Sequence, residues 1–181
     1  MIEVRWHGRG GQGAFTAARL LGAAAVSEDK FALAFPSFGP ERRGAPVLAF
    51  TRIDSRRIGD RSALRRCDFA IVLDDTLIGP HGIEGVREGG AVFINSEREP
   101  GHLQRQGIRV IAVNATSLAK ELLGRPMVNV AMLGALVALD GPVSLDAAES
   151  AVRGEMRGQV AEKNALVLRR CHDLVKEQLR G

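Results

Sequence analysis

A run of glycines near the N-terminus is the part of the sequence best suited to binding a ligand. The run matches the pattern G-x-G-x-x-G, with one glycine more, and it follows an apolar/polar alternation at 2–6. An Ala- and Leu-rich segment at 14–27 comes next, so we expect a strand, a turn and a helix. Glycines let backbone N–H groups turn toward a ligand, and the positive end of a helix attracts an anion. The candidate binding residues of this glycine loop are Gly8, Arg9, Gly10, Gly11, Gln12 and Gly13.

The same glycine pattern occurs in dinucleotide-binding oxidoreductase domains, which are one alternative. In those domains a carboxylate ends the second strand, about 20 residues on, and holds the ribose. Here the second predicted strand, 31–35, runs into Pro36 and Ser37, and the nearest carboxylates precede it. The sequence therefore argues against NAD binding by this domain.

A second alternative is a purely structural turn that lets the first helix pack on the first strand. The extra glycine, Gly11, argues against it. So do the polar ends of Arg9 and Gln12, which have no evident task in such a turn.

A second candidate loop, PSFGPERRGAP at 36–46, carries a charged triplet between glycines and prolines: Glu41, Arg42 and Arg43. A stiff backbone lowers the cost of ordering arginines around an anion, and arginine suits phosphate and carboxylate groups. Internal pairing of Glu41 with one of the arginines is the alternative.

Arginine is concentrated in one part of the chain. The net charge is only +4, but arginines outnumber lysines 21 to 4. Eight of them fall in one window, opposed only by Asp54 and Asp60: Arg42, Arg43, Arg52, Arg56, Arg57, Arg61, Arg65 and Arg66. Such a window is either an anion-binding surface or the face that meets an acidic partner. We do not expect nucleic-acid binding, because aromatic residues make up only 4% of the chain and tyrosine is absent.

Strand-like and helix-like segments alternate through the first two thirds of the chain, which is typical of α/β proteins. We expect strands at 2–6, 31–35, 47–53, 68–73, 91–94 and 108–113. Helices are expected at 14–27, 83–88, 115–123, 127–139 and 159–179, with one more after Ser144. The predicted fold is a three-layer α/β/α arrangement with a mostly parallel or mixed sheet of five to six strands and helices on both faces. We expect residues 1–181 to form a single domain.

Two features of these elements bear on a site. The segment 127–139 is almost wholly apolar, so as a helix it must be buried nearly all round. Polar residues follow several of the strands, where ligands gather in open α/β sheets. These secondary candidates, which could equally be helix caps, are Asp74, Asp75, Asn95 and Asn114.

Composition excludes several functions. Hydrophobic residues make up 45% of the 181, yet no apolar run approaches the ~20 residues of a membrane span. The start lacks a signal-peptide pattern, so we expect a cytoplasmic protein with no membrane contact. Cys67 and Cys171 are far apart, which predicts no disulfide framework and no metal site. The four histidines are scattered, and we expect no catalytic residue in this chain.

At the two loops the sequence resembles the gamma subunit of pyruvate and related 2-oxoacid:ferredoxin oxidoreductases. The resemblance rests on HGRGGQG at 7–13, on FP at 35–36 and on GPERRGAP at 39–46. Asn129 and MLGA at 132–135 resemble that family's late buried helix. The similarity covers essentially the whole chain in the same order.

The resemblance implies a multi-subunit enzyme that oxidatively decarboxylates a 2-oxoacid and passes the acyl group to coenzyme A. Thiamine diphosphate, magnesium and [4Fe-4S] clusters would be carried by partner subunits, and ferredoxin or NAD would accept the electrons. The implied partners are thiamine-binding and 2-oxoacid-binding subunits, a ferredoxin-like cluster subunit and a possible flavin/NAD subunit. This chain would not be catalytically complete alone. It would either line the channel for coenzyme A and substrate or serve a purely architectural role.

Overall fold

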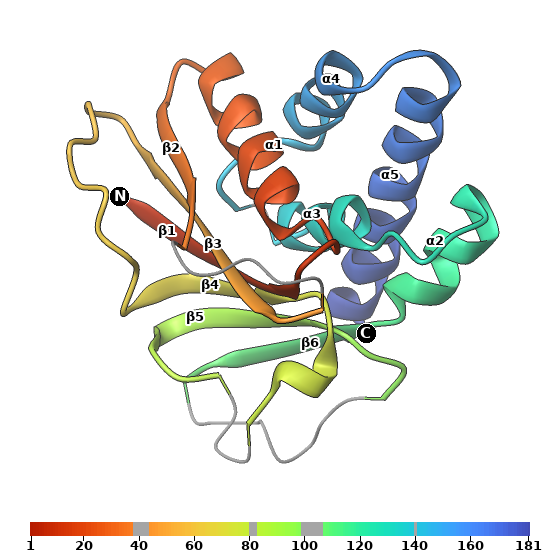
Figure 1. Ribbon diagram of the computed structural model, residues 1–181, viewed down its shortest axis with the longest axis horizontal. Helices are drawn as coiled ribbons and strands as arrows, with labels where there is room; N and C mark the ends of the chain where they lie inside the picture. The colour runs from red at the N-terminus through yellow and green to blue at the C-terminus, as the bar shows by residue number, and fades with distance from the viewer. Residues whose placement is uncertain (38–43, 80–82, 99–106, 140) are drawn as a thin grey trace.

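The computed structural model describes residues 1–37, 44–79, 83–98, 107–139 and 141–181, and within these ranges the chain forms one six-stranded sheet (Figure 1). The strands, in the order in which they lie side by side, are β2 (Phe31–Pro36), β3 (Pro46–Asp54), β1 (Ile2–Arg9), β4 (Cys67–Val72), β5 (Val86–Asn95) and β6 (Arg109–Val113). Strands β1, β4, β5 and β6 are parallel, whereas β3 runs antiparallel to both β1 and β2. The predicted α/β class and the mixed sheet are confirmed.

The helices are α1 (Ala14–Ser27), α2 (Ala115–Leu123), α3 (Asn129–Val137), α4 (Leu145–Glu155) and α5 (Gly158–Arg180), with a short 3₁₀ helix, η1 (Asp75–Leu77). Helix α1 packs on β1, β2 and β3, and α3 packs on β4 and β5. Helices α4 and α5 lie over α1 and α3, so α3 lies between the sheet and α5 (Figure 1). All nine residues of α3 are buried, as its all-round apolar sequence predicts.

Close contact between α3 and α5 depends on Gly134. A Cβ atom at this position would lie 2.1 Å from the carbonyl oxygen of Leu168 on α5. Because that oxygen belongs to helical backbone, it cannot move aside, and the two helices approach this closely only through glycine.

The helices are distributed differently from our expectation of helices on both faces. In the described ranges, the α-helices share one apolar core with one face of the sheet. The second face has its own apolar cluster: Cys67, Ala70, Val72, Val92 and Ile94. Its neighbours, among them Ile78 and Ile83, come from loops and from strand ends. The connections between β3, β4 and β5 thus cover this face in place of α-helices in the described ranges.

The helix predicted at 83–88 is wrong. Residues 83–85 form a turn, and β5 begins at Val86. Gly85 and Gly89 adopt positive φ angles of 78° and 80°, which a helix does not contain. The structure has no helix long and apolar enough to span a membrane in the part of the chain that it describes.

Candidate functional site

The glycine loop connects β1 to α1 and is held in shape by its own side chains. The Gln12 side-chain oxygen accepts a hydrogen bond from the Arg9 N–H at 2.7 Å, and the Gln12 N–H donates to the Arg9 carbonyl at 3.0 Å. Gly11 adopts a φ of 94°, and Gly13 one of 79°. These bonds turn the loop sharply between the strand and the helix.

Asp74, just beyond β4, fixes the loop from outside. One of its carboxylate oxygens accepts hydrogen bonds from Arg9 Nε at 3.0 Å and from Gln12 Nε2 at 3.1 Å. Its other oxygen accepts from the Thr76 N–H at 3.1 Å and caps η1. Partial burial alone would raise the pKa of Asp74, but the hydrogen bonds from Thr76 and Gln12 and the charge of Arg9 outweigh it and lower the pKa. Arg9 and Gln12 therefore have structural partners, which their sequence did not reveal.

The two predicted loops meet. The Gly10 N–H donates to the Ala45 carbonyl at 2.9 Å, and the Gly44 N–H donates to the Gly10 carbonyl at 3.2 Å. Arg9 Nη1 also donates to the Gly44 carbonyl, at 3.1 Å. The end of the second loop thus lies against the glycine loop. Its charged residues Glu41, Arg42 and Arg43 lie outside the described residues.

The N-terminus of α1 presents backbone donors without a side-chain cap. Gly13 is the N-cap residue, and its carbonyl accepts from Ala17, so the N–H groups of residues 14–16 have no partner within the helix. Asn129 Nδ2 donates to the Gly13 carbonyl at 3.3 Å, and a Cβ at Gly13 would lie 2.6 Å from that nitrogen. A glycine is required here by both its positive φ and this contact. The result is an uncapped positive helix end.

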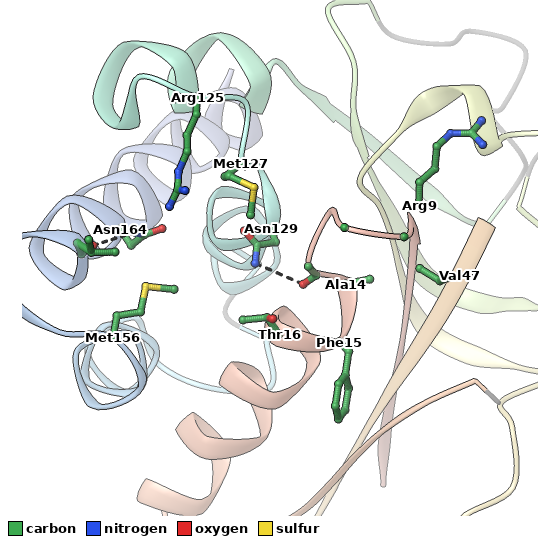
Figure 2. A pocket seen from close by; sticks show the side chains of 14 residues that line it. Arg9, Ala14, Phe15, Thr16, Val47, Arg125, Met127, Asn129, Met156 and Asn164 are labelled. Atoms are coloured by element: carbon green, nitrogen blue, oxygen red, sulfur yellow. Dashed lines mark hydrogen bonds between the residues drawn. The ribbon is translucent and has the colours of Figure 1, made fainter. Parts of the chain in front are cut away.

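A cleft of about 780 Å³ opens in front of this helix end. Figure 2 shows α1 on one side, with Phe15 and Thr16 at its start, and the segment leading into α3 on the other. Arg125 extends its guanidinium into the cleft (Figure 2), and it forms no ion pair or side-chain hydrogen bond with the described part of the chain. The walls are largely apolar, and their side chains come from α1, β3, α5 and the segments that precede α3 and follow α4: Phe15, Val47, Val160, Met127 and Met156.

A smaller basin of about 280 Å³ adjoins the cleft at Arg125. Arg125, Val160 and Asn164 line both spaces, and Lys163 and Gln159 line only the basin. The buried Asn164 donates to the Val160 carbonyl at 2.8 Å and stiffens the first turn of α5. Arg125, Lys163 and a positive helix end therefore line two adjoining spaces, which suit a ligand with separated anionic groups and an uncharged part between them.

The remaining candidate residues divide between this cleft and a second pocket. Arg9, Gly10, Gly11 and Gly13 line the large cleft, whereas Gly8 lies within β1. Gln12 faces a polar pocket of about 330 Å³ at the ends of β4, β5 and β6. That pocket also contains the four polar residues from the strand ends: Asp74, Asp75, Asn95 and Asn114.

Three of the four strand-end side chains in this polar pocket, those of Asp74, Asn95 and Asn114, have structural partners. Asn95 Nδ2 donates to the Leu73 carbonyl and to Thr116 Oγ1, both at 3.0 Å, and Asn114 caps α2 by accepting from the Ser117 N–H at 2.9 Å. Asn95 and Asn114 tie strand ends to α2. The capping interpretation is confirmed for Asn114 and Asp74.

The buried Cys67 and Cys171 and the half-buried His7 lie outside the cleft. Burial and the charge of Arg5 lower the pKa of His7 to about 3, and its Nε2 accepts from Arg5 Nε at 3.0 Å. Burial raises the pKa of Cys67 to about 11 and that of Cys171 to about 12. In the described ranges, no group of three or more His, Cys, Asp or Glu residues is placed to hold a metal ion.

Sequence reasoning missed Arg125, Asn164 and Met156. The sequence did contain an indication of Arg125, because this residue stands between Gly124 and Pro126 immediately before the apolar helix. Asn164 and Met156 had none, because only packing of α4 and α5 over α3 brings them to the glycine loop.

Comparison with known proteins identifies relatives over the whole fold. The profile of the family described as pyruvate ferredoxin/flavodoxin oxidoreductase matches residues 3–174. The pyruvate synthase subunit PorC of Methanocaldococcus jannaschii is 46% identical over 166 residues, which cover 91% of this chain and 92% of the relative. The pyruvate/ketoisovalerate oxidoreductases common subunit gamma of Pyrococcus furiosus is 42% identical over 178 residues, 96% of each chain. The crystal structure of pyruvate oxidoreductase subunit PORC from Thermotoga maritima is 36% identical and superposes with a TM-score of 0.82 over 95% of both chains.

Proposed function

The chain belongs to the pyruvate ferredoxin/flavodoxin oxidoreductase family, as the gamma subunit of a 2-oxoacid oxidoreductase complex, and we propose that its cleft binds coenzyme A. In this proposal the partner subunits carry thiamine diphosphate with magnesium and the [4Fe-4S] clusters, which supply the decarboxylation and electron-transfer chemistry. The present chain binds and orients the thiol acceptor. Ferredoxin or NAD receives the electrons through another subunit.

The observation that carries the proposal is that the uncapped N-terminus of α1 faces Arg125 across one cleft, and the Arg125 guanidinium has no partner in the part of the chain that the structure describes. The N–H groups of residues 14–16 and the helix dipole attract a phosphate group. Arg125 adds a planar donor group that is matched to phosphate oxygens. Coenzyme A carries a diphosphate and a separate 3′-phosphate. In this proposal one of these groups binds at the N-terminus of α1 and the other binds in the basin lined by Arg125 and Lys163.

The apolar wall of the cleft suits the uncharged arm of the same molecule. Phe15 is 39% exposed and Val160 is 50% exposed, so both offer apolar surface to a ligand. Met127 and Met156 line the same space, and methionine side chains adapt to an irregular guest. A smaller anion such as a 2-oxoacid would leave most of this wall empty.

The second loop is part of the proposal. Gly44 and Ala45 hydrogen-bond to Gly10, so the chain leaves that loop at the mouth of the cleft. We propose that Glu41, Arg42 and Arg43, which lie outside the described residues, contribute to binding the charged end of the ligand. With both arginines changed to alanine, the assembled complex should show a higher KM for coenzyme A.

The dinucleotide alternative is disfavoured by the sheet order. A dinucleotide-binding unit places its second strand beside its first, but here β3 lies between β1 and β2. The ribose-holding position at the end of β2 is occupied by Pro36 rather than a carboxylate.

The test is an Arg125→Met substitution in the assembled complex, with Arg170→Met as the control. Arg170 is also exposed, on α5, but it lies outside the cleft. Loss of a charge-assisted phosphate contact should raise the KM for coenzyme A about tenfold or more in the Arg125 variant only. The KM for the 2-oxoacid should not change. An unchanged KM for coenzyme A, or release of the subunit from the complex, would favour the purely architectural role.

A further inference from the structure

Five arginines form an exposed surface at the end of the sheet away from the cleft. They lie in residues 55–66, which connect β3 to β4 and pass beside the N-terminus (Figure 1). We call these residues the arginine surface: Arg56, Arg57, Arg61, Arg65 and Arg66. Strand β1 separates the two regions, because Ile2 pairs with Ile53 at this end and Arg9 pairs with Pro46 at the other. The seven residue steps from Ile2 to Arg9 along β1 place the two regions about 23 Å apart.

The carboxylates near the arginine surface are already paired with other groups. Asp54 pairs with the N-terminal ammonium of Met1 at 3.4 Å. Asp60 pairs with Arg52 at 3.1 Å, and Asp68 pairs with Arg87 at 2.8 Å. The five guanidinium groups form no ion pair or hydrogen bond within the described ranges. Their positive charge is therefore available to a partner.

Two buried arginines hold the backbone that carries this surface. Arg52 is only 3% exposed; it pairs with Glu3 at 3.0 Å and donates to the Asp60 carbonyl. Arg5 is 8% exposed, and it donates to the Leu64 carbonyl at 3.4 Å and to the Glu84 carbonyl. Because these bonds already fix residues 60–65, little conformational entropy is lost when a partner binds them.

Exposed apolar side chains lie at the same end of the sheet as the arginine surface. Phe31 of β2 pairs in register with Asp54 of β3, and Met1 reaches the same Asp54 through its ammonium group. Phe31 is 48% exposed and Met1 is 61% exposed. Aromatic residues, methionine and arginine are the side chains enriched at protein–protein interfaces. Nucleic acid is a poorer fit, since residues 55–66 contain no aromatic side chain for stacking on bases.

We propose that the arginine surface, together with Met1 and Phe31, binds an acidic face of another subunit of the same oxidoreductase complex. The proposal rests on membership of a multi-subunit complex and is independent of the coenzyme A proposal, because the two regions lie at opposite ends of β1. The expected partner surface has several carboxylates around an apolar spot, and it contacts residues from β2, β3 and the β3–β4 connection.

The test compares two triple variants of this chain, each assembled with the other subunits. The first is Arg56→Glu, Arg57→Glu and Arg61→Glu. The control changes the charge equally on exposed arginines elsewhere: Arg98→Glu, Arg170→Glu and Arg180→Glu. The dissociation constant of the subunit is measured at low and high salt, and the unfolding temperature shows that each variant is folded.

The first variant should bind the other subunits at least about tenfold more weakly than the control, with the loss reduced at high salt. Phe31→Ser should weaken assembly with little dependence on salt. Equal assembly of the two triple variants would overturn the proposal. So would tight binding of duplex DNA by the unaltered chain that the first variant alone loses while its complex stays intact.

Discussion

The carboxylate of Asp74 accepts a hydrogen bond from the Arg9 guanidinium at 3.0 Å, and this contact joins the end of β4 to the glycine loop at the mouth of the cleft. The same carboxylate oxygen holds Gln12 at 3.1 Å. Two segments separated by more than 60 residues are thus fastened at the point where α1 begins. These contacts therefore hold the N-terminus of α1 in its orientation toward the cleft.

Removing that carboxylate should loosen the glycine loop. In Asp74→Asn, the charge-assisted bonds to Arg9 and Gln12 are weakened, and amide hydrogens of residues 10–16 should exchange about tenfold faster. Asp75→Asn is the matched control, since Asp75 is exposed and adjacent but does not contact the loop. Equal exchange in the two variants would show that Asp74 does not hold the loop.

His7 should make the chain less stable in mild acid. Its pKa in the folded chain is about 3, below the ordinary value of 6.5, so folding favours the neutral ring. The stabilisation is fully present above pH 6.5 and is lost as the pH falls from 6.5 toward 3. Between pH 7 and pH 5 the free energy of unfolding should fall by about 2 kcal/mol on this account.

His7→Gln is the variant that isolates this effect, because its amide oxygen can accept from Arg5 without titrating. Urea unfolding at the two pH values should show a smaller decrease for this variant than for the unaltered chain. Identical decreases would assign the acid sensitivity to other groups.

Both thiols should be unreactive in the folded chain. Cys67 and Cys171 are fully buried, and burial raises their pKa values to about 11 and about 12. At pH 8 the folded chain should therefore resist alkylation by iodoacetamide, whereas the chain in denaturant should gain two labels. Rapid labelling of the folded chain would contradict the burial of these side chains.

Gly134 should tolerate no side chain. In Gly134→Ala the new Cβ would meet the Leu168 carbonyl, and separation of α3 from α5 should lower the free energy of unfolding by about 3 kcal/mol. Gly154→Ala on α4 is the control, because open space surrounds that position. The control should be stabilised by about 0.5–1 kcal/mol. Chemical denaturation measures both, and a neutral Gly134→Ala would show that the helices separate easily.

The sequence predicted the elements better than their contacts. The six strands and the buried helix around Met132 follow from local pattern, and the meeting of the glycine loop with Gly44 follows from both loops joining strand ends. Residues 83–88 do not form the expected helix, because Gly85 adopts a positive φ angle and the strand β5 begins at Val86. The grouping of the helices on one face was hidden, since apolar alternation does not show what covers each face of a strand.

The candidate site was predicted only in part, for the same reason. Glycine spacing identified the loop, but the partners of Arg9 and Gln12 lie on a distant strand end. Asn164 and Met156 reach the cleft only after α4 and α5 pack over α3. Such contacts depend on tertiary structure and leave no periodic signal in the chain.

The most direct test of the account is an experimental structure of the assembled complex with coenzyme A bound. The account predicts phosphate oxygens within hydrogen-bond distance of the N–H groups of residues 14–16 and of the Arg125 guanidinium, with the uncharged arm against Phe15 and Val160. Coenzyme A bound entirely to other subunits, with no atom of it in this cleft, would contradict it.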